Sequence, residues 1–75
     1  MKLLLFGYLA EITGRTELEL SDMGDTDSLM KKLISDFPTL KNSKFLISVD
    51  KKIIKGNVKL GNGNVVALLP PFAGG

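Results

Sequence analysis

The two most apolar segments of this chain lie at its opposite ends. Residues Lys2–Phe6 and Val65–Leu69 are both of strand length, and Lys2 is the only polar residue in either of them. Runs of this kind are typical of strands that lie inside a sheet rather than at its edge. We therefore predict that the first and last strands lie side by side at the centre of one sheet, with the rest of the chain folded around them.

The residues after the first apolar segment predict a short helical turn and a second strand. Tyr8–Thr13 has Leu9 and Ile12 three positions apart, and Gly14 is suited to end a helix in the left-handed conformation. Thr16–Leu20 alternates strictly between polar and apolar residues. We expect its leucines to face the core and its two glutamates to face water.

The main helix is predicted from residue 25 to residue 37. Asp25 or Thr26 can cap its first turn, and Pro38 disfavours helical geometry at the residue before it. Between these limits, the apolar side chains recur at the spacing of one helical face. They are Leu29, Met30, Leu33, Ile34 and Phe37. The following residues, Thr39–Lys44, are expected to form a loop.

The second half of the chain predicts a hairpin and a final strand. Phe45–Val49 and Ile53–Ile54 are apolar runs joined by a polar tip at residues 50–52. Gly61–Asn64 contains only glycine and asparagine, which are typical of turns. Strand pairing should end at about Leu69, because the two prolines that follow cannot donate a hydrogen bond to a neighbouring strand.

This order of elements predicts an α+β fold of the β-grasp, or ubiquitin-like, type. The sheet would be mixed, with parallel central first and last strands and the main helix packed on one face. Residues 1–69 would form the globular domain and residues 70–75 an extended tail. The end strands also give the sheet a second apolar face, because their side chains alternate between its two sides. Either the loops and the residue 8–13 turn bury that face, or a partner contacts it.

The composition limits the chemistry that the chain can carry. The 75 residues make one domain, and they include no Cys and no His. These absences exclude a thiolate site and argue against a self-contained catalyst, so we expect no bound metal or cofactor. The lysines are scattered, and the chain has only one Tyr and four Phe, so we expect no nucleic-acid surface. The first apolar run is too short for a signal peptide or membrane span, which favours a cytoplasmic protein without membrane contact.

The tail is the most informative segment for function. The carboxylate of Gly75 has no side chain to hinder it, and the two prolines reduce the conformational freedom of the segment that presents it. An extended tail of this length reaches about 20 Å, which would let it enter the active site of a partner. We expect chemistry at the carboxylate of Gly75, and contact with the partner through the residues before it. These are Pro70, Pro71, Phe72, Ala73 and Gly74.

A simpler interpretation of the tail is that its glycines form only a loose chain end and its prolines only stop a strand. Each feature alone favours that interpretation. Their combination with a β-grasp pattern and with the absence of Cys favours chemistry at the terminus.

The final residues, VVALLPPFAGG, resemble the ending of the small subunit of molybdopterin synthase, a family of ubiquitin-like sulfur carriers. The segments Leu3–Gly7 and Leu9–Gly14 are also similar to that family. The resemblance implies that an enzyme related to ubiquitin-activating enzymes uses ATP to adenylate Gly75, and that a sulfur donor protein then supplies the sulfur of a thiocarboxylate.

The resemblance also implies an acceptor and a partner. In the family, the carrier binds the large subunit, in a heterotetramer, and the large subunit holds the catalytic groups. The thiocarboxylate there donates sulfur to a cyclic pyranopterin precursor, which becomes molybdopterin in the biosynthesis of the molybdenum cofactor. The chain would then be a non-catalytic carrier.

Two positions depart from the pattern of that family. It commonly has an acidic residue beside the glycine before the last strand, where this chain has Gly61–Asn64. It often has Asn followed by Gly at the hairpin tip, where this chain has Asp50 and Lys51. Neither departure falls on the terminal residues.

Two alternatives stay open. The sulfur could pass to another acceptor, such as the thiazole of thiamine, a tRNA base or an amino acid, although the carriers for thiazole usually lack the Pro70-Pro71 pair. The chain could also be a ubiquitin-like interaction module, or a modifier joined to lysines through Gly75.

Overall fold

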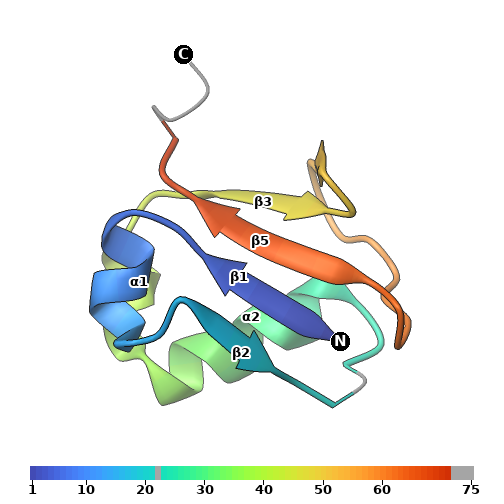
Figure 1. Cartoon of the computed structure of the whole chain (residues 1–75), viewed down its shortest axis with the longest axis horizontal. Helices are drawn as coiled ribbons and strands as arrows, with labels where there is room; N and C mark the ends of the chain where they lie inside the picture. The colour runs from blue at the N-terminus through green and yellow to red at the C-terminus, as the bar shows by residue number, and fades with distance from the viewer. Residues whose placement is uncertain (22, 72–75) are drawn as a thin grey trace.

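The computed structural model describes residues 1–21 and 23–71, and its elements form a single sheet with a helical layer on one side (Figure 1). The strand order is β2-β1-β5-β3-β4. In chain order, the elements are β1 (Lys2–Leu5), α1 (Tyr8–Thr13), β2 (Glu17–Glu19), α2 (Thr26–Asp36), the 3₁₀ helix η1 (Pro38–Asn42), β3 (Leu46–Val49), β4 (Lys52–Ile53) and β5 (Val65–Leu69).

The first and last strands pair as predicted. β1 and β5 run parallel, with Leu3 opposite Val66 and Leu5 opposite Leu68, and β5 lies at the centre of the sheet. The other strand pairs are antiparallel. Together with α2 across one face, this arrangement is the β-grasp roll expected from the sequence.

Helix α2 begins and ends where the local sequence requires. The Asp25 side chain accepts a hydrogen bond of 2.9 Å from the backbone N–H of Ser28 and so caps the first turn. The helix ends at Asp36, and Phe37 leaves the helical region ahead of Pro38. The predicted helix and cap are therefore confirmed.

The loop predicted for Thr39–Lys44 is wrong over most of its length. Pro38–Asn42 forms the 3₁₀ helix η1, with proline in its first turn. Proline is suited to that position, because its fixed φ is helical and its missing N–H would have no partner inside the helix. Leu40 is 1% exposed and anchors the segment in the core. This segment has no helical periodicity that could predict the helix, because a single buried leucine makes no repeat.

The predicted hairpin is confirmed, with a tighter tip than expected. Asp50 and Lys51 both have positive φ, at 50° and 72°, and they alone connect β3 to β4. A two-residue connection with two positive φ values is the turn that best matches the twist of an antiparallel pair. Lys52, which we had placed in the tip, is instead the first residue of β4.

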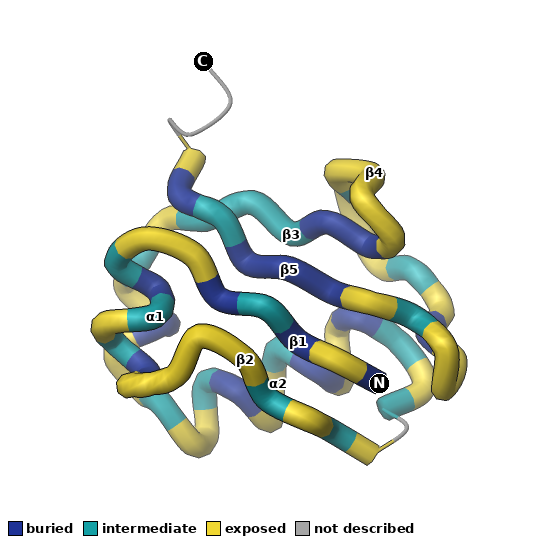
Figure 2. The backbone as a smooth tube through the Cα atoms, in the orientation of Figure 1, coloured by how far each residue is buried: buried dark blue, intermediate teal, exposed yellow. Residues whose placement is uncertain are grey.

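The core lies between the sheet and α2 (Figure 2). Its fully buried side chains come from both layers, and α1 and η1 close one end. The most buried apolar ones are Leu3, Leu9, Leu29, Leu33, Leu40, Val66 and Leu68. Over the described residues, no helix is long and apolar enough to cross a membrane.

Candidate functional site at the end of the last strand and the open face of the sheet

The end of β5 is held firmly by its neighbours. Leu69 is opposite Leu46 of β3, and the backbone N–H of Phe6 donates a hydrogen bond of 3.1 Å to the carbonyl of Leu68. Pro70 is buried and Pro71 is exposed. The last described residues, Pro70 and Pro71, therefore lie at the carboxyl ends of β1 and β5 (Figure 1), and we call this point the exit of β5.

The predicted site residues are divided by the limits of the described chain. Pro70 and Pro71 lie at the exit of β5, one inside the surface and the other outside it. Phe72, Ala73, Gly74 and Gly75 lie outside the described residues. The roles assigned to all six stay predictions.

Gly7 lies directly against the exit. It follows β1 with φ 56° and ψ −137°, a conformation that L-residues with a side chain rarely adopt. A Cβ atom at this position would lie 2.6 Å from Cγ of Pro70. The sequence analysis treated Gly7 only as a break between two elements, because its contact with residue 70 depends on the pairing of β1 with β5.

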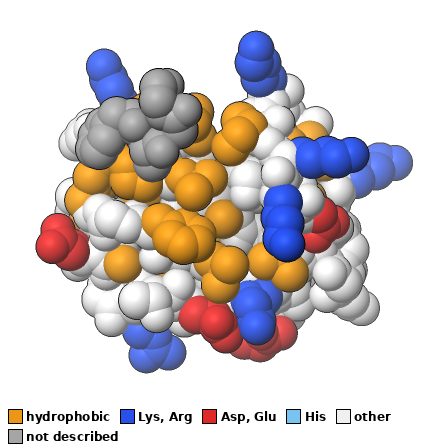
Figure 3. All heavy atoms as spheres, turned by 45° about the horizontal axis from the view of Figure 1, so that its top comes forward, with side chains coloured by type: hydrophobic (Ala, Val, Ile, Leu, Met, Phe, Trp, Pro, Cys, Tyr) orange, Lys and Arg blue, Asp and Glu red, His pale blue; other side chains and the backbone are white. Residues whose placement is uncertain are grey.

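The face of the sheet opposite α2 has no described element over it (Figure 1). Side chains from β1, β3, β4 and β5 line a shallow groove of about 600 Å³ on this side. We call its apolar residues the open face: Leu4, Phe6, Ile53, Val65, Ala67 and Leu69. Figure 3 shows hydrophobic side chains gathered over this part of the surface.

Several residues of the open face are far more exposed than is usual for large apolar side chains. Phe6 is 45% exposed, Ile53 is 53% exposed and Val65 is 37% exposed. The sequence analysis left open whether the loops and the residue 8–13 turn bury this second apolar face or a partner contacts it. Within the described residues, neither the loops nor α1 bury it. Contiguous exposed apolar surface of this kind often marks a site of protein interaction.

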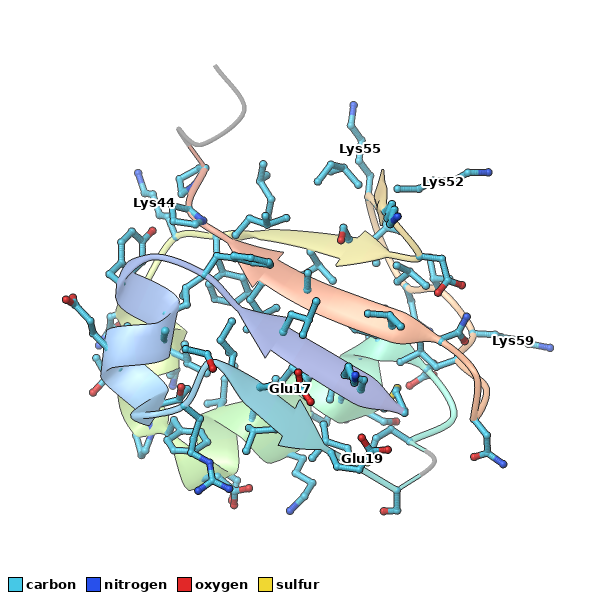
Figure 4. The ribbon with its side chains drawn as sticks, in the orientation of Figure 1. Glu17, Glu19, Lys44, Lys52, Lys55 and Lys59 are labelled. Atoms are coloured by element: carbon cyan, nitrogen blue, oxygen red, sulfur yellow. The ribbon has the colours of Figure 1, made fainter. Side chains whose placement is uncertain are left out.

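The two edges of the open face differ in charge. Glu17 and Glu19 belong to β2 at one edge of the sheet, whereas Lys52 and Lys55 lie at the other edge, on and just after β4 (Figure 4). Lys2 forms an ion pair with Glu17 at 3.6 Å, and the N-terminal amine forms one with Glu19 at 3.5 Å. The acidic edge is thus partly neutralised within the protein.

Asp50 ties the hairpin tip to the start of β5. Its carboxylate accepts hydrogen bonds from the backbone N–H of Val65, at 2.9 Å, and from Nδ2 of Asn64, at 2.6 Å. These two donors, the backbone N–H first, lower the pKa of the Asp50 carboxyl below its ordinary value. The turn is therefore best stabilised with Asp50 ionised.

The described residues contain no group of three or more carboxylates that could hold a metal ion. What the arrangement does provide is a last strand that stays paired up to Leu69, beside an exposed apolar face with a lysine-bearing edge.

The last strand is central and parallel to the first strand, and one main helix packs on the face of the sheet opposite the open face. This arrangement defines a ubiquitin-like β-grasp protein. The model of the ThiS family matches residues 3–75. The chain therefore belongs to this family. No curated protein matches the sequence.

Solved structures with the same fold carry two kinds of description. A putative molybdopterin converting factor, subunit 1, from Pyrococcus furiosus superposes with a TM-score of 0.78 at 20% identity, covering 93% of this chain and 94% of that chain. The small archaeal modifier protein 1 from Methanosarcina acetivorans gives 0.80 at 24% identity, covering 99% and 94%. SAMP1 from Haloferax volcanii gives 0.75 at 20% identity, covering 100% and 98%.

Proposed function

We propose that this protein is a sulfur carrier that loads and delivers sulfur at the main-chain carboxylate of Gly75. The observation that carries the proposal is the rigid exit of β5, where Leu69 is still paired and Pro71 is already exposed beside the open face. Membership of the ThiS family over residues 3–75 supports the same function. Phe72–Gly74 would then occupy the entrance of the partner's active site and contact its walls.

The loading reaction needs two steps, both catalysed by a partner. In the first, a Gly75 carboxylate oxygen attacks the α-phosphorus of ATP, and pyrophosphate leaves. In the second, a sulfur nucleophile at the level of hydrosulfide attacks the glycyl carbonyl, and AMP leaves with its electron pair. A carboxylate is a poor acceptor until it carries such a leaving group, and an unhindered glycine lets both reagents approach closely. The chain itself has neither Cys nor His to catalyse these steps.

The open face is proposed to hold the activating enzyme. It is continuous with the tail, because Leu69 is both a residue of the open face and the last paired residue before the prolines. A partner that covers the open face would therefore receive the tail without a second docking surface. The exposed Phe6 and Ile53 can supply apolar contact area, at up to about 1.5–3 kcal/mol for each side chain fully buried.

We propose a pyranopterin precursor as the sulfur acceptor, with this chain as the small subunit of molybdopterin synthase. The ending VVALLPPFAGG and the Pro70-Pro71 pair support this choice. A solved structure described as a molybdopterin converting factor subunit has the same fold over nearly its whole length. In this role, the large subunit supplies the catalytic groups and takes the thiocarboxylate into its own active site.

A second candidate is a protein modifier. Two of the solved structures with the same fold are small archaeal modifier proteins, and each is covered over more than nine-tenths of its length. The activation step would be the same, but a lysine amine of a target protein would attack the glycyl adenylate and displace AMP. The product would be an isopeptide bond from Gly75 instead of a thiocarboxylate.

Intact-mass analysis tests the proposal and separates the two candidates. The protein is incubated with a ubiquitin-activating-like enzyme, ATP and a sulfur source, and a variant lacking Gly75 serves as the control. A carrier gains the mass of one sulfur and loses that of one oxygen, and fragmentation places the change at Gly75. A modifier keeps its mass when it is not conjugated. Proteolysis of the conjugates then leaves a remnant that ends in Gly75 on lysines of other proteins. Unchanged mass in a competent system, with no such remnant, contradicts both candidates.

Delivery to the pterin is tested in a second assay. Thiocarboxylated protein is mixed with a molybdopterin synthase large subunit and the cyclic precursor, and product formation is followed with return of the carrier to its original mass. A carrier that is loaded but converts no precursor would instead serve another acceptor.

A further inference from the structure

The contact between Gly7 and Pro70 joins two segments that are 63 positions apart in the chain. Gly7 is the second residue after β1, and Pro70 directly follows the last residue of β5. They meet because β1 and β5 are parallel and in register, with Leu5 opposite Leu68. The hydrogen bond from the N–H of Phe6 to the carbonyl of Leu68 continues this pairing up to the contact itself.

The fit is closer than any side chain at position 7 would allow. A Cβ atom there would lie 2.6 Å from Cγ and 3.5 Å from Cδ of Pro70, whereas carbon atoms in ordinary contact are about 3.5–4.0 Å apart. The proline ring would therefore have to move by about 1 Å. Because the ring is closed on the backbone, Cγ can move only by a change of ring pucker or together with the backbone of Pro70.

The turn that carries Gly7 is also fixed in place. Leu9 donates its backbone N–H to the carbonyl of Phe6, and Ala10 donates its own to the carbonyl of Gly7, both at 3.1 Å. Leu9 is completely buried, so α1 anchors this turn to the core. A clash between a side chain at position 7 and Pro70 would therefore move Pro70, whose next residue is exposed, rather than the turn.

From this geometry we infer that Gly7 is a positioning residue for the proposed loading reaction: its missing side chain seats the Pro70 ring and so sets the direction in which the chain leaves the body. This inference rests on the proposed function, since it matters only if the terminus has to reach a partner's active site. Displacements of about 1 Å in a reacting group can lower a rate about a hundredfold. Docking through the open face would be unaffected.

The test compares steady-state adenylation by the activating enzyme, measured by ATP–pyrophosphate exchange, for the wild type, Gly7→Ala and Gly14→Ala. Gly14 also has a positive φ, 73°, but a Cβ there would meet no atom within 4 Å, so this variant controls for backbone strain. We expect Gly7→Ala to lower kcat about tenfold or more with KM within about threefold, at a temperature where each variant is fully folded. Gly14→Ala should keep the wild-type kcat, whatever its effect on Tm.

Pro70→Ala keeps the inference testable if Gly7→Ala does not fold. Removing the ring also removes the seat, so Pro70→Ala should lower kcat without changing KM, and the double variant should lose little more than either single variant. Wild-type kcat in Gly7→Ala or in Pro70→Ala overturns the inference, as does additive loss in the double variant. If the wild type is not adenylated at all, it is the proposed function that fails.

Discussion

At the scale of single residues, the two positions where this chain departs from the pattern of the small subunits are in direct contact. Asp50 stands where Asn is common, and Asn64 belongs to the Gly61–Asn64 loop, where an acidic residue is common beside the glycine. In the structure, Nδ2 of Asn64 donates to a carboxylate oxygen of Asp50 at 2.6 Å. The two departures from the pattern are therefore joined by one hydrogen bond between an amide and a carboxylate.

This pairing predicts a rescue by exchange. Asp50→Asn should lower Tm by a few degrees, because an amide in place of the carboxylate accepts the Val65 and Asn64 hydrogen bonds less strongly. Adding Asn64→Asp restores a carboxylate partner for the new amide. Thermal unfolding should therefore show the double variant closer to the wild type than Asp50→Asn is. Equal or greater loss in the double variant would mean that Asn64 acts alone, through its 2.6 Å contact with the backbone N–H of Gly61.

The same carboxylates predict how stability depends on pH. Hydrogen bonds from Ser28, through its side chain and its backbone N–H, and then from Asn57 lower the pKa of Asp25, as those from Val65 and Asn64 lower that of Asp50. A pKa that is lower in the folded state stabilises the protein at pH values above the unfolded pKa. That contribution is lost as the pH falls through the folded value. Tm should thus hold between about pH 7 and 5 and fall below about pH 4.

The pH prediction has an internal control. In Asp50→Asn, the tip no longer titrates, so the fall in Tm at acid pH should be shallower than in the wild type. A parallel fall in both proteins would show that Asp50 contributes nothing to the acid transition.

At the scale of elements, the sequence predicted best where many residues repeat one pattern. The end strands and α2 were predicted correctly, because their apolar spacing and their terminal residues agree. Helix η1 was missed, because it depends on one proline and one buried leucine, Leu40, whose burial is decided by tertiary packing. The turn at Asp50 and Lys51 was predicted to be one residue longer than it is, because neither residue is a glycine, the residue type that would indicate positive φ.

Helix α2 is the longest helix over the core face of the sheet, so its central leucine should be decisive for stability. Leu33 is 1% exposed, and Leu33→Ala should cost about 2–5 kcal/mol, the sum of lost burial and a cavity. Ser35 is exposed on the same helix, and Ser35→Ala should change stability by less than about 0.5 kcal/mol. Denaturant unfolding measures both. A cost below about 1 kcal/mol for Leu33→Ala would mean that the thin core can close around the missing atoms.

At the scale of the whole molecule, the sequence predicts chemistry at Gly75, which lies outside the described residues, but it does not predict which surface would dock a partner. A diglycine after two prolines can be found by inspection, and so can a second apolar face. That the face stays uncovered depends on where the loops and α1 pack, which no local pattern encodes. The contribution of Ile53 and the contact of Gly7 with Pro70 likewise arise only when β3, β4, β1 and β5 are assembled into one sheet.

The open face and the exit should therefore affect different kinetic constants. Ile53 is 53% exposed on the open face, so Ile53→Ser should leave Tm nearly unchanged, yet raise KM for the activating enzyme about tenfold, the effect of losing about 1.4 kcal/mol of contact. Its kcat should stay near the wild-type value, because the exit of β5 is intact. Lys59→Ser is the matched control, since the backbone of Lys59 forms an isolated antiparallel β-bridge with Asp25 at the start of α2, away from the open face.

A comparison of Ile53→Ser with Gly7→Ala distinguishes docking of the body from orientation of the tail. If the body is held by the open face and the tail is directed by the Gly7 contact, Ile53→Ser changes mainly KM and Gly7→Ala mainly kcat. Should Ile53→Ser leave KM at the wild-type value, the activating enzyme would be recognising the tail alone. The exposed apolar face would then need another occupant, and the lysine-bearing edge formed by Lys52 and Lys55 would be the next surface to test by charge reversal, with Lys59→Glu as the control.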